Sequence, residues 1–307
     1  MADRLQEIEV FVAVADAGGL SRAAARMRLS APAVTRALAA LEDRLGVRLF
    51  NRTTRSLTLT EAGARFLESA RRILADLEDA RNVAMGASAV PQGHLSITAS
   101  VTFGRAILAP IVCSFLERYP RVSVSLMLQD RITNLVDEGL DLAVRIGDLP
   151  DSSLIARRLG AVRRVLVASP GYLARHGAPA TPADLKHHAI IAFTGLMPMR
   201  EWRHHDGVRH VSTPLAPAFE INDALAALQA AKQGHGIAPA LSYMVHEDIR
   251  DGSLVEVAPG GPQPDLAVQI VYPHSRLVAP KVRGFVDFAA PVIAAELERI
   301  ALPVPHP

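Results

Sequence analysis

Hydroxyl, guanidinium and small side chains gather at one predicted helix start, and this is the chemistry that contacts base edges and phosphates in a DNA groove. Ser30 occupies an N-cap position and Pro32 falls in the first turn, where its missing N–H costs nothing. Thr35 and Arg36 lie on the outer face of the same helix. The DNA-binding residues predicted here and in the neighbouring elements are Ser21, Arg22, Ser30, Ala31, Pro32, Ala33, Thr35, Arg36, Arg52, Thr53, Thr54 and Arg55.

Three short helical patterns are needed to position this surface. Apolar residues at helical spacing between Leu5 and Ala15 predict the first helix, which Gly18 and Gly19 end. The second helix is expected from Ser21 to Met27. The third should end at Gly46 and bury Val34, Leu38, Leu41 and Leu45. Together these patterns predict a helix-turn-helix.

Basic charge is concentrated in the same region. Eight arginines lie between Leu20 and Leu59 against two acids, Glu42 and Asp43, although the formal charge of the whole chain is only +2. Such a patch attracts phosphates without regard to sequence. Two strand patterns at 49–52 and 57–59 flank a basic tip and predict a wing. A solvated arginine-rich face is the alternative, but helix spacing, capping and charge all favour one DNA-binding unit.

This region resembles the winged helix-turn-helix of LysR-type transcriptional regulators over about 55 residues. The resemblance is carried by Phe11, Ala23, Ala24, Pro32, Ala33, Val34, Thr35, Leu41, Glu42, Leu45, Gly46, Leu49, Phe50, Arg52, Leu59, Thr60, Ala62 and Gly63. The chain departs from the family at Ala31, where glutamine is frequent, and at Thr35, where serine is frequent. Because glutamine can read adenine bidentately, the resemblance implies DNA binding but no transferable operator sequence.

A long helix is predicted from Thr60 to about Met85, with apolar residues at heptad spacing. The residues expected to make a dimer interface are Phe66, Ala70, Ile73, Leu77 and Ala80. The helix could instead pack on its own domain, but its length and flanking charges favour pairing with a second chain. The resemblance implies the same role, that of a dimerising linker. Gly and Pro residues then predict a hinge at 87–93.

After the hinge, strand and helix patterns alternate, which predicts an α/β fold with a mostly parallel sheet. Strands are expected at 95–100, 122–128, 142–146, 162–168, 190–193, 236–241 and 268–272, and helices at 105–118, 132–138, around 172, 224–233 and 278–300. The order suggests two lobes, with the chain crossing near Arg163 and returning near Ala267. The resemblance implies the same two-lobed effector domain, similar to periplasmic solute-binding proteins.

The predicted fold class is therefore α/β with an N-terminal all-α winged helix-turn-helix. The expected divisions are a DNA-binding domain at 1–59, a linker helix at 60–86, the hinge at 87–93 and an effector domain at 94–302. Within the effector domain, lobe I is expected at about 94–162 and 269–302, and lobe II at about 163–268.

Ligands of open α/β sheets bind at the carboxyl ends of the strands, beside helix N-termini. Free N–H groups and hydroxyls between Ser100 and Gly104 favour an anion, so a small organic anion is the expected effector. The predicted effector-binding residues are Ser100, Val101, Thr102, Gln129, Ile146, Phe193, Thr194, Asn222 and Gly236. The alternative is that their polar groups merely cap helices.

Other functional classes find little support. The chain lacks a P-loop, a G-x-S-x-G elbow and an H-E-x-x-H motif, and its histidines lack metal-ligand spacing, so no enzyme, cofactor or metal site is expected. The lone Cys113 cannot form an internal disulfide and is expected to be a small buried side chain. Arg163 and Arg164 are compatible with either a solvated ridge or a contact between subunits.

No apolar run is long enough to span a membrane without an interrupting charge, and the first ten residues lack a signal-peptide layout. A periplasmic receptor and a ligand-independent architectural protein are therefore less favoured than a cytoplasmic regulator. The expected partners are double-stranded DNA, a small-molecule effector and further copies of the chain, as a dimer or a dimer of dimers.

Overall fold

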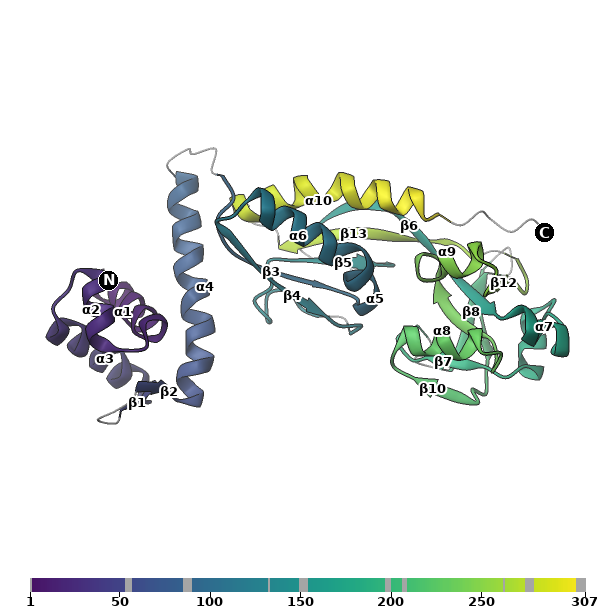
Figure 1. Cartoon of the computed structure of the whole chain (residues 1–307), viewed down its shortest axis with the longest axis horizontal. Helices are drawn as coiled ribbons and strands as arrows, with labels where there is room; N and C mark the ends of the chain where they lie inside the picture. Colours follow the sequence, from purple (N-terminus) through teal and green to yellow (C-terminus); the bar gives the residue numbers. More distant parts are fainter. Residues whose placement is uncertain are drawn as a thin grey trace. The chain divides into compact units, whose positions relative to one another are not determined.

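The computed structural model describes residues 2–52, 57–84, 90–131, 133–148, 154–196, 200–205, 209–261, 263–273 and 279–301. It divides into two compact units, residues 1–89 and 90–307 (Figure 1). None of the helices in these described ranges is long and apolar enough to cross a membrane.

The first unit is a winged helix-turn-helix followed by a long helix. Its elements are α1 (Ala2–Ala17), α2 (Leu20–Met27), α3 (Ala31–Leu45), β1 (Phe50–Arg52), β2 (Leu57–Leu59) and α4 (Glu61–Ala84). The wing is an antiparallel pair in which Phe50 lies opposite Leu59. The predicted helices and wing are confirmed, but Leu45 is 40% exposed and does not belong to the core.

Phe11 joins the parts of this unit. Its ring centroid lies 5.4 Å from that of Phe50 in the wing and 5.2 Å from that of Phe66 in α4. Around it, Val34 and Leu38 of α3 are fully buried. The recognition helix, the wing and the start of α4 therefore share one hydrophobic core, and burying such side chains stabilises their mutual arrangement.

The start of α4 is fixed to the turn that follows α3. Glu42 Oε1 accepts hydrogen bonds from the N–H groups of Leu49 and Phe50, at 2.8 and 3.2 Å. Thr60 Oγ1 accepts from Gly63 N at 2.9 Å and donates to the Arg48 carbonyl at 2.8 Å. A Cβ at Gly63 would lie 2.0 Å from the Leu49 carbonyl oxygen, so only glycine permits this approach.

The first turns of α4 belong to the core of the unit. Ala70 is fully buried by its own chain, and Phe66 packs against the same core, so Ala70 has no surface left for a second chain. Farther along the helix, Ile73 is 43% exposed and Leu77 is half-buried. The part of the heptad pattern that remains available for another molecule therefore begins at Ile73.

The second unit contains a seven-stranded sheet in the order β11-β6-β13-β5-β3-β4, with β12 also paired to β6. The strands are β3 (Gly93–Ala99), β4 (Val122–Leu128), β5 (Leu142–Ile146), β6 (Leu154–Ala168), β11 (Ala238–Leu241), β12 (Val255–Val257) and β13 (Asp265–Pro273). β3 is parallel to β4 and β5, whereas β13 is antiparallel to β5 and β6. The sheet is thus mixed, and the prediction of a mostly parallel sheet is wrong because the long strands β6 and β13 run in opposite directions.

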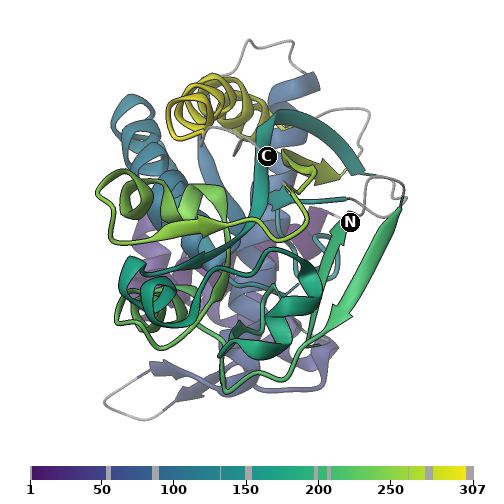
Figure 2. The ribbon, with the colours of Figure 1, turned by 90° about the vertical axis from the view of Figure 1, so that its right-hand side faces the viewer.

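Helices cover this sheet and flank it. They are α5 (Val101–Phe103), a π-helical turn (Gly104–Leu108), α6 (Ala109–Arg118), α7 (Pro170–His176), a 3-10 turn (Pro182–His187), α8 (Ala224–Lys232), α9 (Ser242–Arg250) and α10 (Pro280–Arg299). Short additional strands are β7 (Ile191–Phe193), β8 (Glu201–His205), β9 (His210–Pro214) and β10 (Phe219–Ile221). Figures 1 and 2 show α10, in yellow, beside α6.

The helix predicted at 132–138 is absent from the described residues 133–138, which form turns instead. Asn134 explains the difference, because its side chain accepts from Val136 N at 3.1 Å and donates to Asp137 at 2.7 Å. Such local side-chain bonds compete with the helical pattern. Ile132, the predicted first residue of this helix, lies outside the described residues.

The two largest hydrophobic cores of the second unit define its two halves. β3, β5, α6 and α10 surround Phe115 and Phe285, whose rings pack edge to face at 5.1 Å; we call this half lobe I. β7, α8, β11 and α9 surround the second core, which contains Phe193 and Leu228; we call this half lobe II. β6 belongs to both halves, because Leu154–Arg163 pairs with β13 and Arg164–Ala168 pairs with β11 and β12.

Replacing Gly63 with Ala should destabilise the winged unit by roughly 1–3 kcal/mol, because the new methyl group meets the Leu49 carbonyl. Hydrogen exchange at the wing, measured in the full-length protein over a urea series, reports this loss. Gly171→Ala is the control, since no atom lies within 4 Å of a Cβ at that position. Equal wing protection in the two variants would contradict the steric argument.

Candidate nucleic-acid interface and ligand cleft

The start of α3 presents the small and polar residues that the sequence predicts to face DNA. Ser30 Oγ accepts from Ala33 N at 3.3 Å and caps the helix. Ala31, Pro32 and Arg36 are exposed, whereas Thr35 is half-buried. The Thr35 hydroxyl donates to the Ala31 carbonyl at 3.0 Å, so its free lone pairs and its methyl group are what it offers to a partner.

Basic side chains flank this helix start. Ser21 and Arg22 are exposed at the start of α2, and Arg22 Nη2 donates to the Gly18 carbonyl at 2.9 Å. Arg44 is neutralised by Glu7, but within the described part of the unit no ion pair neutralises Arg36. Arg52 lies in β1, and the predicted wing-tip residues Thr53, Thr54 and Arg55 lie outside the described residues.

A cavity of about 530 Å³ opens between the two lobes of the second unit. Four of the predicted effector residues line it: Ser100, Gln129, Ile146 and Phe193. The other five, Val101, Thr102, Thr194, Asn222 and Gly236, are outside its lining. Its volume lies within the usual range of small-molecule sites, about 300–1,000 Å³.

The five outlying residues have other environments. Thr102 is buried, with 9% of its surface exposed, and Thr194 donates its N–H to the Ile221 carbonyl at 2.9 Å. Asn222 is exposed, and α8 is capped instead by Asp223, which accepts from Ala226 N at 2.8 Å. At Gly236 a Cβ would lie 2.4 Å from the Ala189 carbonyl oxygen, which gives this glycine a packing role.

The helix start at Val101 is not open to an anion. Asp130 Oδ1 accepts the Val101 N–H at 3.1 Å, so a carboxylate of the protein already occupies this position. A second negative charge would be repelled there. The prediction that an anion binds the free N–H groups between Ser100 and Gly104 therefore needs correction, although Ser100 itself does line the cavity.

Ser100 and Tyr243 place two hydroxyl groups close together. Both oxygens are buried, and within the described ranges neither has a partner other than the neighbouring hydroxyl. Burial raises the pKa of Tyr243, so its phenol stays protonated. Buried polar atoms in native proteins are nearly always paired, which makes this pair of hydroxyls a candidate contact for a ligand.

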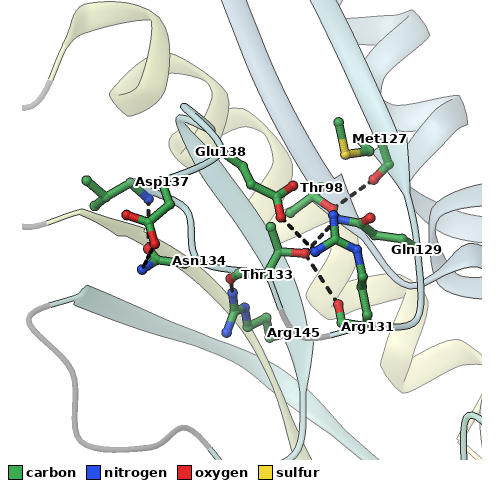
Figure 3. Close-up of polar contacts among 10 residues, drawn as sticks. Thr98, Met127, Gln129, Arg131, Thr133, Asn134, Asp137, Glu138 and Arg145 are labelled. Carbon is green, nitrogen blue, oxygen red and sulfur yellow. Dashed lines mark hydrogen bonds and ion pairs between the residues drawn. The ribbon is translucent and has the colours of Figure 1, made fainter.

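Lobe I contributes a polar wall, drawn in Figure 3. Arg145, from β5, donates to the Thr133 carbonyl, and Gln129 Nε2 donates to Thr133 Oγ1 at 2.5 Å. Arg131 forms an ion pair with Glu138 at 2.7 Å. Burial lowers the pKa of Arg145, which marks its guanidinium as poorly solvated.

Lobe II contributes Arg164, from β6, and Arg203, from β8. Arg203 is paired with Glu201 at 2.7 Å, whereas Arg164 Nε is buried without a hydrogen-bond partner among the described residues. Burial, and then the charge of Arg203, lowers the pKa of Arg164. The lining arginines are therefore the main cationic groups of the cavity.

The sequence analysis did not identify these arginines as site residues. It left Arg163 and Arg164 open as a solvated ridge or a subunit contact, but Arg163 is only 6% exposed and pairs with Glu256 at 2.7 Å. Successive strand residues face opposite sides, so burial of Arg163 places Arg164 on the other side. This alternation was the only signal in the sequence for a cavity residue at this point, and it could not determine which of the two arginines faces the cavity.

The expectation for Cys113 is wrong, and one histidine is buried. Cys113 is exposed on α6 and is not the buried side chain predicted. His204 is buried, with 8% of its surface exposed, and its ring contacts the Trp202 carbonyl at 3.3 Å. Among the described residues, no group of three or more His, Cys, Asp or Glu side chains could hold a metal ion.

Comparisons with known proteins cover both units. Residues 5–64 match the model of the bacterial regulatory helix-turn-helix protein, lysR family, and residues 88–294 match the LysR substrate binding domain. A transcriptional repressor of Pseudomonas aeruginosa is 34% identical over 98% of this chain and 96% of its own length. The regulator CrgA of Neisseria meningitidis serogroup B is 34% identical over 94% of this chain and 96% of its own.

Solved structures agree. The CrgA structure from Neisseria meningitidis is 33% identical, covers 95% of this chain and 98% of its own, and has a TM-score of 0.59. The full-length Vibrio cholerae virulence activator AphB is 30% identical over 93% of this chain and 98% of its own, with a TM-score of 0.58.

Replacing Arg36 with Ala should weaken specific DNA binding by roughly 1–3 kcal/mol without unfolding the protein, because the side chain is exposed on α3. Gel shifts with the DNA upstream of the chain's own gene measure the loss. Arg118→Ala removes an exposed arginine from the other unit and should leave affinity unchanged. Equal affinity of the Arg36 and Arg118 variants would contradict the groove assignment.

Proposed function

The chain belongs to the LysR family of bacterial transcriptional regulators, and we propose that its operator binding is modulated by a small organic anion held between its two lobes. DNA binding by the winged unit and effector binding by the C-terminal domain are properties of the family. The anionic nature of the effector is the part that this chain's own cavity supports.

The unsatisfied polar atoms of the cavity carry the proposal. Arg164 Nε from lobe II is buried without a partner within the described part of the chain, and Ser100 Oγ from lobe I is buried with only the Tyr243 hydroxyl beside it. Both residues line the same cavity. Leaving such groups unpaired costs roughly 1–3 kcal/mol each, and more for a charged one. A ligand that accepts hydrogen bonds from both removes this cost, and a carboxylate does so best.

The same site offers a means of regulation. The two lobes are joined by β6 and β13, so a ligand that contacts both lobes favours the arrangement in which those contacts form together. A change in lobe arrangement alters DNA binding only if the ligand has different affinities for the two states. We propose that this difference controls how dimers, or dimers of dimers, occupy an operator.

We propose that the chain dimerises through the distal part of α4, around Ile73, Leu77 and Ala80, and acts in the cytoplasm. The support is the exposure of Ile73, at 43%, on a helix whose proximal residues are used by its own core. We further propose that residues 1–59 bind DNA, that 60–86 form the linker, that the hinge predicted at 87–93 ends before Pro91, and that 94–302 bind the effector. Pro91 is buried and Gly93 already belongs to β3, so the hinge does not extend past residue 90 as a free segment.

A panel of small organic acids should contain at least one compound that raises the melting temperature of the full-length protein, because a ligand that binds only the folded state stabilises it by mass action. Ser100→Ala should reduce this shift, whereas Thr102→Val should retain it, since Thr102 is outside the cavity lining. The Arg36→Ala variant should lose DNA affinity and keep the shift. Loss of the shift in Thr102→Val with retention in Ser100→Ala would contradict the site.

Ile73→Asp should shift the protein toward monomer and weaken operator binding, because a charge would be buried without a partner at the proposed interface. Light scattering of the full-length protein measures the mass. Ala64→Asp places the same charge at an exposed position of α4 outside the heptad pattern and should leave the mass unchanged. An unaltered mass in Ile73→Asp would remove this helix from the interface.

A further inference from the structure

We propose that the effector carries two separate carboxylates, one bound by Arg145 in lobe I and the other by Arg164 in lobe II. This inference rests on the proposed function, because it names the chemical class of the anion that the cavity takes. It goes beyond the proposed function because it requires two separate negative charges on the effector rather than one.

The charge balance of the cavity singles out these two arginines. Four arginines line it, but Arg131 is paired with Glu138 and Arg203 with Glu201, each at 2.7 Å. Within the described part of the chain, neither Arg145 nor Arg164 forms an ion pair with a carboxylate. Among the described residues, Arg145 donates only to the backbone carbonyl of Thr133, and Arg164 Nε has no acceptor.

The acidic residues of the cavity do not compensate for them. Asp130 and Asp148 both line the cavity, but Asp130 accepts the N–H of Val101 at 3.1 Å. No ion pair joins either aspartate to Arg145 or Arg164 in the described ranges. Among the described residues, these two guanidinium groups therefore have no paired carboxylate from the protein itself.

Both groups are also partly withdrawn from water, since burial lowers the pKa of Arg145 and of Arg164. A guanidinium keeps its proton in proteins, so the charge stays and its poor solvation remains a cost. A carboxylate offers the bidentate geometry that matches this planar donor. Each arginine can therefore form a charge-assisted pair with a ligand carboxylate.

The two arginines belong to different lobes, which favours two anionic groups over one. Arg145 lies on β5, opposite Gln269 of β13, whereas Arg164 lies on β6, opposite Leu241 of β11. Two carboxylates on one molecule can pair with both at once and so link the lobes.

Apolar side chains in the same lining indicate the chemistry of the rest of the ligand. Phe193, Leu196, Met244 and Leu266 all line the same cavity. Burying apolar surface against them is favourable, so the spacer between the two carboxylates should be apolar, either a methylene chain or a ring. Unsubstituted diacids such as adipate and phthalate combine these features.

The test is calorimetric titration of the full-length protein with succinate, glutarate, adipate, suberate and phthalate, each beside its monocarboxylate analogue, such as hexanoate for adipate and benzoate for phthalate. The diacid that binds best should bind at least about 10-fold more tightly than its analogue, the size expected for one charge-assisted pair. Arg145→Gln and Arg164→Gln should each lower its affinity by roughly 10–100-fold.

The monocarboxylate makes the test selective, because it can satisfy only one arginine. At least one of the two substitutions should therefore leave its affinity unchanged while lowering that of the diacid. Arg118→Gln is the matched control: it removes an exposed arginine of the same unit that does not line the cavity, and the diacid's affinity should change by less than about 3-fold.

Three results would overturn the inference. If monocarboxylates bound as tightly as every diacid, a second carboxylate would not be required, and the effector with one anionic group would remain as the proposed function. Phosphate that binds more tightly than every diacid would have the same consequence. Failure of all acids of both classes to bind would overturn both this inference and the anionic effector, while operator binding would remain a separate property of the winged unit.

Discussion

The buried pairing of Arg163 with Glu256 determines how the ligand-binding unit is organised. Two hydrogen bonds, at 2.7 and 3.1 Å, join the guanidinium to the carboxylate, and the Arg163 N–H donates to Ser242 Oγ at 3.1 Å. Loss of one member of such a buried pair typically costs roughly 3–5 kcal/mol. This pair holds β6 at the residue where it passes from β13 to β11 and β12.

The position of Arg164 follows from that constraint. Because neighbouring residues of a strand face opposite sides, the buried Arg163 directs Arg164 toward the cavity. The protein thus places two adjacent arginines in different roles: one stabilises the crossing between the lobes, and the other faces the ligand. A ligand that pairs with Arg164 acts on the strand that both lobes share, which is where a local contact can bias their arrangement.

The winged unit achieves its geometry by a different means. Its core is small, and Phe11 connects α1 with both the wing and α4 through two ring contacts. The Glu42 carboxylate accepts hydrogen bonds from the backbone N–H groups of Leu49 and Phe50, just beyond the end of α3. As a result, one of only two acids in the arginine-rich segment is turned inward, and the exposed surface of α3 stays basic.

Local patterns in the sequence were sufficient for the winged unit, because its helices depend on caps, glycine stops and spacing between near neighbours. Ser30, Pro32 and Gly46 act in the structure where these rules place them. Local patterns also predicted the alternation of strands and helices in the second unit, apart from the helix expected at 132–138. They could not give the mixed direction of the sheet, which depends on β13 returning next to β6 from about a hundred residues away.

In the ligand cleft, too, some residues could be predicted from local sequence patterns and others depended on the tertiary structure. Ser100, Gln129, Ile146 and Phe193 follow from the rule that ligands meet strand ends, and the structure brings them to one cavity. Arg145, Arg164 and Arg203 come from three strands that meet only in the folded chain, so no spacing in the sequence reveals them. Asp130 shows why: the helix start that looks open to an anion in the sequence is closed by a carboxylate from another loop. Charge and capping are local properties that a sequence displays, whereas the compensation of one charge by another is decided by tertiary structure.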